Sequence, residues 1–242
     1  MDDELDQLLD SLKLGRIREI LDDHVTAVTT DGPSYTDFLR HLLREEHHAR
    51  QMRFLEARVH RAQLPERWPL ETFPWERQPA VRRAVIEQLA NLDFVGDAFN
   101  LVFIGPTGVG KTGLASGILL KALLAGRRCL FMPAQDLFDD MFRSLADHSS
   151  RKLVDRILRM EVLQIDELGY LNLRPEQSNI FFKLMEERYT RRLCTIITTN
   201  LDYEEWYGFL GQKPMVQALL DRLRHRCHTI RIDGPSLRSP TG

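Results

Sequence analysis

Apolar side chains recur at helical spacing through the first part of the chain. The leucines and isoleucines between Leu5 and Leu21 repeat as on one helix face, and the Asp-Gly-Pro stretch at 31–33 breaks the pattern. Ser34, with Asp37 three residues later, resembles a capping box and starts a second, longer helix that runs to about 62. Its apolar stripe consists of Phe38, Leu42, Ala49, Met52, Phe54 or Leu55, and Val59. We therefore expect residues 1–63 to form a small, all-helical N-terminal domain.

Prolines interrupt the chain between Leu64 and Pro79. Four prolines in this segment exclude a continuous helix, because proline lacks a backbone N–H and disfavours a helical residue before it. We expect residues 64–79 to form an extended strap between the helical region and the rest of the chain.

Beyond the strap, and after a helix over about 80–92, short apolar strands alternate with helical segments. We expect strands at Leu101–Ile104, Cys129–Met132, Val162–Ile165, Thr195–Thr198 and Thr229–Ile232. We expect helices between them at Lys111–Ala125, Gln135–Ala146, Lys152–Arg159, Pro175–Arg192 and Pro214–His225. Strands joined by helical crossovers predict an α/β domain over residues 80–242, with a five-stranded parallel sheet flanked by helices on both faces.

Composition narrows the class of protein. A hydrophobic content of 43% and a charged content of 28% are typical of a soluble globular protein. The net charge of −2 predicts no general attraction to polyanions, so any contact with nucleic acid requires local clusters of basic residues. Three cysteines far apart in the sequence favour free thiols over disulfides or a metal site. The acidic N-terminus lacks an apolar signal core, and no apolar run approaches membrane-spanning length, which favours the cytoplasm and no membrane contact.

The strongest chemical signal lies between the first expected strand and the helix after it. This segment reads GPTGVGKT and comprises Gly105, Pro106, Thr107, Gly108, Val109, Gly110, Lys111 and Thr112. Glycines in such a loop let backbone N–H groups converge on a phosphate at a helix N-terminus. A lysine at position 111 can place its charge on the β- and γ-phosphates, and the Thr112 hydroxyl can bind Mg²⁺. The pattern predicts a P-loop that binds a nucleoside triphosphate.

Polar side chains follow two later strands. Asp166 and Glu167 end the third strand, and Asn200 follows the fourth. Ligands of a parallel sheet bind beyond the carboxyl ends of its strands, so we expect these side chains beside the P-loop. Asp166 is then a candidate for positioning Mg²⁺, Glu167 for activating a water molecule and Asn200 for holding that water or sensing the γ-phosphate. Acids at a helix start and an asparagine in a turn are the structural alternatives.

One arginine on the last expected helix has two interpretations. Arg222 either pairs locally, with Asp221 or with the helix C-terminus, or reaches the γ-phosphate of a neighbouring subunit as an arginine finger. The residues alone favour the local role.

Taken together, these motifs resemble the AAA+ ATPases, and the IstB family in particular. The resemblance rests on GPTGVGKT, on IDELGY from Ile165 to Tyr170, and on TTNL and LLDRL with Trp206 between them, and it includes SYTDFLRHLLREE at 34–46. It implies an ATP-hydrolysing enzyme that uses Mg²⁺, with Arg222 acting in trans. Most AAA+ proteins continue into a C-terminal helical lid. We expect no such lid in this chain, and Arg238 is the candidate to replace the sensor of that lid.

The same resemblance implies partners. IstB-like proteins assist insertion-sequence transposases, so it implies a homo-oligomer with ATP sites between subunits, bound to duplex DNA largely without sequence preference, and a partner transposase. A DnaC-like loader of a replicative helicase is the alternative, and a DNA scaffold in which ATP only switches assembly is another.

Basic side chains cluster in two places that suit DNA. The second helix carries Arg40, Arg44, Arg58 and Arg61 on the side away from its apolar stripe, and the segment between the second and third strands carries Arg151 and Lys152. Acidic neighbours leave a solvated surface with local ion pairs as the alternative. In the strap, Phe73 and Trp75 either stack on adenine or dock on the α/β domain.

Overall fold

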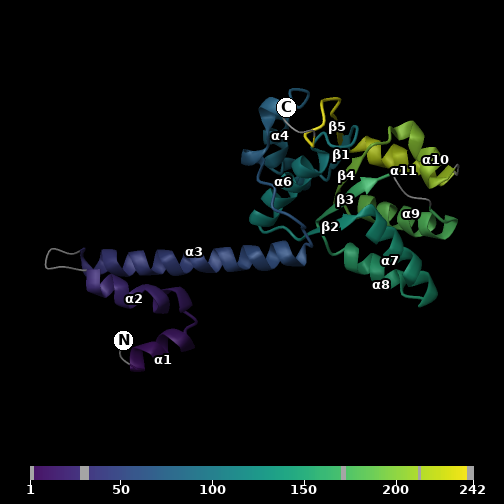
Figure 1. The fold of residues 1–242 in the computed structure, drawn as a ribbon. Coiled ribbons are helices and arrows are strands. Elements are labelled where there is room, and N and C mark those ends of the chain that lie inside the picture. Colours follow the sequence, from purple (N-terminus) through teal and green to yellow (C-terminus); the bar gives the residue numbers. More distant parts are fainter. Residues whose placement is uncertain (1–2, 28–32, 170–172, 212–213, 239–242) are drawn as a thin grey trace. The chain divides into compact units, whose positions relative to one another are not determined.

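The computed structural model describes residues 3–27, 33–169, 173–211 and 214–238. The chain divides into two compact units, residues 1–58 and 59–242, whose elements are labelled in Figure 1. The domain boundaries expected from the sequence, after residues 63 and 79, stay a prediction. Tyr170 and the expected helix break at Asp31 and Gly32 lie outside the described residues. Within the described ranges, no helix has the length and apolar character needed to cross a membrane.

The N-terminal unit contains α1 (Asp3–Ser11), α2 (Gly15–Ala27) and the first part of α3 (Tyr35–Arg61). Its core consists of Leu9, Ile17, Ile20, Leu21 and Leu42. The expectation of a single first helix is wrong, because the chain turns between α1 and α2 at Lys13, which has a left-handed φ of 56°. The capping residues before α3 are confirmed, since the Asp37 backbone N–H donates to Ser34 Oγ at 3.2 Å.

A buried carboxylate ties α3 to α2 within this unit. Glu46 is 3% exposed and accepts hydrogen bonds from the backbone N–H groups of Arg16 and Ile17, at 2.8 and 3.2 Å, at the start of α2. By contrast Met52 and Phe54, expected in the apolar stripe of α3, are 39% and 59% exposed. The stripe therefore buries Leu42 and, near its end, Val59, and leaves Met52 and Phe54 in solvent.

The second unit is an α/β fold around a five-stranded sheet in which every pair of neighbouring strands is parallel. The strands are β1 (Asn100–Ile104), β2 (Cys129–Pro133), β3 (Val162–Leu168), β4 (Cys194–Thr199) and β5 (Cys227–Arg231). Their order across the sheet is β2-β3-β4-β1-β5, so β1 lies between β4 and β5. Because β3, β4 and β1 are parallel neighbours, their carboxyl ends lie side by side at one end of the sheet. The P-loop follows β1 at that end.

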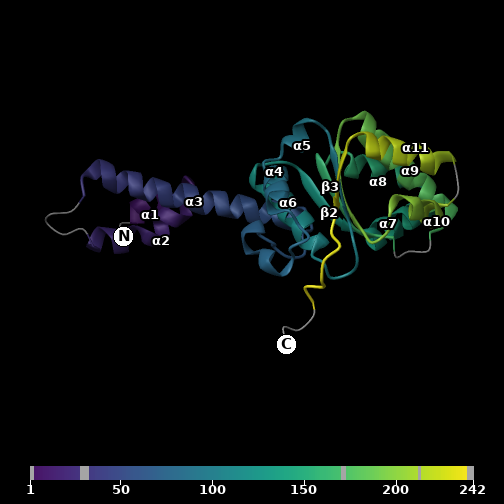
Figure 2. The same ribbon diagram turned by 90° about the horizontal axis from the view of Figure 1, so that it is seen from above.

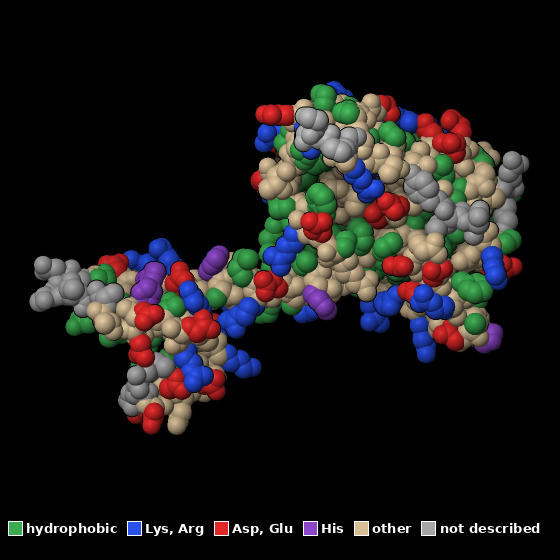
Figure 3. Space-filling view, viewed as in Figure 1, with side chains coloured by type: hydrophobic (Ala, Val, Ile, Leu, Met, Phe, Trp, Pro, Cys, Tyr) green, Lys and Arg blue, Asp and Glu red, His purple; other side chains and the backbone are tan. Residues whose placement is uncertain are grey.

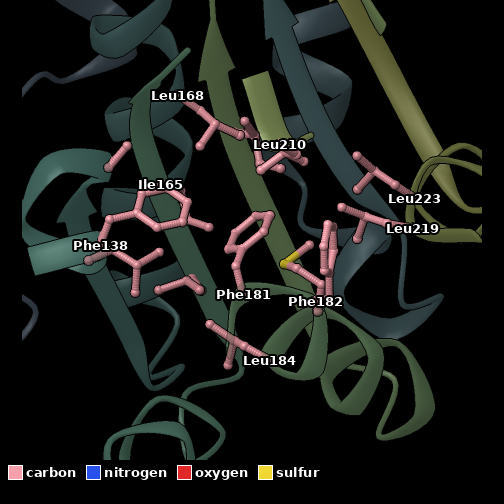
Figure 4. Packing of buried hydrophobic residues seen from close by; sticks show 14 of the residues in the cluster. Phe138, Ile165, Leu168, Phe181, Phe182, Leu184, Leu210, Leu219 and Leu223 are labelled. Carbon is pink, nitrogen blue, oxygen red and sulfur yellow. The ribbon is translucent and has the colours of Figure 1, made fainter. Parts of the chain in front are cut away.

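Helices cover both faces of the sheet (Figures 1 and 2). Their bounds are α4 (Arg83–Ala90), α5 (Asp93–Gly96), α6 (Lys111–Leu124), α7 (Ala134–Ala146), α8 (Ser150–Ile157), α9 (Pro175–Thr190), α10 (Trp206–Leu210) and α11 (Pro214–His225). Alternate strand residues such as Ile165 pack against α7, α9 and α11, and Figure 4 shows Phe138, Phe181 and Leu219 in this core. Gln164, which points to the other face, donates to Ser116 of α6 at 3.1 Å.

The strap packs on α6 and contains two short 3₁₀ turns, η1 (Leu70–Thr72) and η2 (Trp75–Arg77), so it is less extended than expected. A Cβ on Gly117 of α6 would lie 2.5 Å from Leu70 Cδ2, and one on Gly113 would lie 3.4 Å from the Trp68 ring. These glycines let the strap approach the helix closely. After β5, the described residues 232–238 contain no helix.

Candidate active site

Glycines in the loop that follows β1 occupy positions where a side chain does not fit. Gly108 and Gly110 have φ values of +86° and +94°, which other residues adopt only with strain. A Cβ on Gly108 would lie 2.2 Å from Ser236 Oγ, and one on Gly110 would lie 2.8 Å from Phe73 Cε2. The strap and the segment after β5 therefore press on the P-loop closely enough to exclude side chains there.

Lys111 begins α6 and is 9% exposed. Its Nζ donates to the carbonyl oxygens of Gly105 and Pro106, each at 2.8 Å. Burial lowers the pKa of this lysine, and the nearby carboxylates of Asp166 and Glu167 act in the opposite direction. The ammonium group is thus held within the loop, beside the space that phosphates occupy in a P-loop.

A carboxylate and two hydroxyl groups meet where β3, β4 and α6 converge. Asp166 accepts hydrogen bonds from Thr112 Oγ1 at 3.0 and 3.1 Å and from Thr198 Oγ1 at 2.6 Å. Burial raises the pKa of Asp166, which these two hydroxyl donors partly offset. Mg²⁺ is usually held by one or two carboxylates together with substrate phosphates and water. The neighbouring oxygens of Thr112 and Asp166 fit that requirement.

Glu167 owes its direction to an irregularity in β3. The pairing of β3 with β4 shifts between Ile165 and Leu168, and Glu167 has a left-handed φ of 59°. Its backbone N–H donates to Thr198 Oγ1 at 2.9 Å, which holds the bulge in place. Bulges re-aim a side chain out of the strand alternation. The exposed Glu167 side chain accordingly lines the same cavity as Lys111.

The left-handed backbone at Glu167 has a measurable cost. We expect Glu167→Gly to have a free energy of unfolding about 1 kcal/mol higher than Glu167→Ala, because only glycine adopts this φ without strain. Urea unfolding of the two variants measures the difference. Asn179, which is exposed within α9, is the control position. There the glycine variant should have a lower free energy of unfolding than the alanine variant, because glycine destabilises a helix interior. Equal stabilities of the two Glu167 variants would show that the backbone is unstrained.

Asn200 follows β4 and has an unsatisfied polar atom. Its Oδ1 is buried and has no hydrogen-bond partner among the described residues. Such atoms are rare in folded proteins and call for an explanation, such as a ligand or a water molecule. Asn200 lines the cavity with Glu167, so its side chain borders the space that a bound molecule would occupy.

These groups line one cavity of about 470 Å³. Of the predicted residues, it is lined by Thr107, Gly108, Gly110, Lys111, Thr112, Asp166, Glu167, Asn200 and Arg238. Gly105, Pro106 and Val109 are not among its lining residues. Residues that the sequence did not assign also line it: Trp68, Pro74, Arg77, Gly113, Pro133, Thr199 and Leu237. For Trp68 and Pro74, the only sequence signal is the aromatic and proline content of the strap.

The structure distinguishes the two strap aromatics that were considered for stacking on adenine. Phe73 lines the cavity, whereas Trp75 is not among its lining residues. Trp75 Nε1 donates to the carbonyl oxygen of Leu70 at 3.2 Å, and Arg83 lies over its ring at 5.4 Å from the centroid. Trp75 therefore docks on the protein, and Trp68 and Phe73 present aromatic surface to the cavity.

Arg222 does not line this cavity. It lies on α11, with its Nη1 3.3 Å from Glu186 Oε1 of α9, so its ion-pair partner in the structure is Glu186 rather than Asp221. It borders a separate space of about 150 Å³ between α9 and α11. The side chain is 42% exposed.

The basic residues considered for DNA differ in their surroundings. Arg40 pairs with Asp37, and Arg151 pairs with Asp155 and Glu187, each at 2.9 Å. Arg44 and Lys152 are exposed, and Arg58 and Arg61 lie in the last turns of α3. Figure 3 shows acidic and basic side chains interspersed over α1 to α3. No purely basic face appears in that view, and acidic neighbours already pair with part of the set.

Comparison with known proteins places the chain in a family. The model of the IstB-like ATP binding protein family matches residues 7–241. The chain is 34% identical over 235 residues to the ATP-binding protein of insertion sequence IS21 from Pseudomonas aeruginosa, covering 97% of this chain and 88% of that protein. It is 33% identical over 210 residues to the ATP-binding protein of insertion sequence IS5376 from Geobacillus stearothermophilus, covering 87% and 83%.

The α/β unit is also similar in fold to a solved structure. The DnaC helicase loader is similar to 62% of this chain and 88% of its own, with a TM-score of 0.55 and 23% identity. The P-loop, the strand order and the family match make this protein an ATPase with the AAA+ fold. The chain belongs to the IstB-like ATP binding protein family.

Proposed function

We propose that this protein is an ATP-dependent helper of DNA transposition. It oligomerises with ATP on duplex DNA and delivers that DNA to a partner transposase, or activates the transposase. Relatives that belong to insertion sequences support the transposition role. One observation carries the ATPase role: the P-loop lysine, both strand-end acids and the Asn200 side chain line a single cavity.

In this proposal the P-loop binds the triphosphate. Backbone N–H groups of the loop and the N-terminus of α6 bind the phosphates, and Lys111 exchanges its carbonyl partners for phosphate oxygens. Thr112 and Asp166 would hold Mg²⁺, which, when bound, neutralises charge on the phosphates. Thr198 keeps the Asp166 carboxylate oriented through its 2.6 Å hydrogen bond.

Hydrolysis then depends on the two strand ends. The Glu167 carboxylate accepts a proton from the water that attacks the γ-phosphorus, while the bond from that phosphorus to the β–γ bridging oxygen breaks. The Asn200 side chain, which lines the cavity together with Glu167, orients the same water through a hydrogen bond.

Two arginines complete the proposed site from different chains. Arg238 lines its own chain's cavity and acts there as a sensor of the nucleotide. Arg222 acts on the γ-phosphate of a neighbouring subunit, which makes ATP part of the joint between subunits. Its ion pair with Glu186 joins two half-exposed side chains, and such pairs are weak enough to exchange for a phosphate.

DNA contact is proposed for Arg40, Arg44, Arg58, Arg61, Arg151 and Lys152. We expect Arg40→Ala with Arg44→Ala to weaken duplex binding similarly for all sequences. We also expect the slope of log K against log salt to fall by about 1 for each arginine that binds a phosphate and is replaced. Fluorescence anisotropy with a labelled duplex, in ATP analogue and at several salt concentrations, measures both effects.

The matched control is Arg83→Ala, which removes an exposed arginine that pairs with Glu87 on α4. It should leave both affinity and slope unchanged. If the α3 variant binds duplex as the unaltered protein does, the DNA-contacting role of α3 is wrong.

The choice of partner needs its own experiment. The tagged protein is mixed in ATP with the transposase of an adjacent gene or with the replicative helicase of its host. Capture of the transposase alone is expected. Capture of the helicase alone would favour the loader function and contradict transposition.

A further inference from the structure

A buried glutamine joins three segments of the α/β unit. Gln78 directly follows η2 and is 0% exposed. Its Nε2 donates to the carbonyl oxygen of Val109 in the P-loop and to that of Pro235 after β5, each at 3.0 Å. One side chain from the strap therefore bridges the P-loop and the C-terminal segment, defined here as residues 233–238.

The orientation of this amide follows from its partners. Both neighbours are carbonyl oxygens, which can only accept, so the NH₂ end must face them. Gln78 Oε1 then points away and is buried with no hydrogen-bond partner in the described part of the chain. Leaving an amide oxygen unpaired in the interior costs free energy, so the retention of a polar side chain here calls for a reason.

The C-terminal segment is fitted to Gln78 and to the P-loop along its length. A Cβ on Gly234 would lie 1.6 Å from Gln78 Oε1, so a side chain at that position would displace the amide. Further along, the Leu237 backbone N–H donates to the Gly108 carbonyl oxygen at 2.8 Å. The next residue is Arg238, which lines the nucleotide cavity beside Lys111.

We propose that Gln78 is a positioning residue: it fixes the C-terminal segment to the P-loop and thereby sets the place of Arg238 at the nucleotide. This inference rests on the proposed nucleotide role of the cavity. Nucleotide occupancy and the position of the C-terminal segment are then coupled, because both depend on the backbone of one loop: its N–H groups bind the phosphates, and the carbonyl oxygens of Gly108 and Val109 accept hydrogen bonds from Leu237 and Gln78. We therefore expect a substitution at Gln78 to change the affinity of the protein for a nucleoside triphosphate.

The first test needs no nucleotide. In Gln78→Met, which keeps the length of the side chain and removes both donors, we expect amide hydrogen exchange across residues 233–238 to be about tenfold faster. Mass spectrometry of peptides from the full chain measures it. Gln88→Met, at an exposed glutamine of α4, is the matched control and should leave this exchange unchanged. Unchanged exchange in Gln78→Met would overturn the inference, whether or not the protein binds ATP.

The second test is a double-mutant cycle on binding of a fluorescent ATP analogue. We expect Gln78→Met to weaken binding about tenfold. In the Arg238→Ala background the same change should have an effect of less than about twofold, since Gln78 acts through Arg238. Fully additive effects would indicate general destabilisation and contradict the positioning role. If the unaltered protein binds no analogue, the proposed function fails, and the exchange measurement still decides whether Gln78 holds the segment.

Discussion

Arg222→Ala is expected to lower the ATPase rate of the assembled protein by about 10³-fold or more, with ATP still bound. Removing an arginine that neutralises charge on the transferring phosphoryl group has an effect of this size in related phosphoryl-transfer enzymes. Because Arg222 does not line its own chain's cavity, its replacement should leave nucleotide affinity nearly unchanged. Steady-state hydrolysis and equilibrium binding of an ATP analogue, measured on the same preparation, separate the two quantities.

The control for this prediction lies on the same helix. Arg224 lies 5.3 Å from the centroid of the Tyr203 ring, and Arg224→Ala should retain most of the activity. Mixing Arg222→Ala with Glu167→Gln tests whether the site is shared: some interfaces then combine an intact Glu167 with an intact Arg222 from the neighbour. If an obligate mixture regains no hydrolysis, the shared site is wrong.

Glu167→Gln should lower the rate of the chemical step by about 10²- to 10⁴-fold, because the amide cannot accept the proton of the attacking water. Glutamine has nearly the same shape, so the bulge in β3 and the binding of ATP should persist. Single-turnover hydrolysis, together with the affinity for an ATP analogue, measures the change.

Glu204→Gln provides the matched control, since Glu204 is exposed in η3 (Tyr203–Glu205), away from the cavity lining. It should hydrolyse ATP at the normal rate. A Glu167→Gln protein with normal single-turnover hydrolysis would remove Glu167 from its proposed role as the base.

Much of the α/β fold was predictable because its signals are local. Each of the five strands was expected within three residues of its observed limits. Four of them are buried parallel strands, which form short apolar runs bounded by polar residues, whereas β5 is largely exposed. The start and end of α11 were predicted to the residue, Pro214 and His225. The short helices α5 and α10 were missed, because four or five residues show no helical periodicity.

The candidate site was predictable to a similar extent. The P-loop and the strand-end acids follow from local motifs and from the rule that ligands bind at the carboxyl ends of parallel strands. The bulge that turns Glu167 into the cavity was not predictable, because it depends on the pairing of β3 with β4. From the sequence, Phe73 and Trp75 were equal candidates either to stack on adenine or to dock on the α/β domain. Only the packing of the structure distinguished them.

Sequence alone predicted the chemical character of this protein: a P-loop, two strand-end acids and an amide, each recognisable within a few neighbouring residues. Tertiary structure decided which distant segments complete the site. Gln78 and Pro235 are 157 positions apart, yet one hydrogen bond joins them across the P-loop. No periodicity or motif encodes such a contact, because it forms only when the sheet has brought the strap and the C-terminal segment to the same loop.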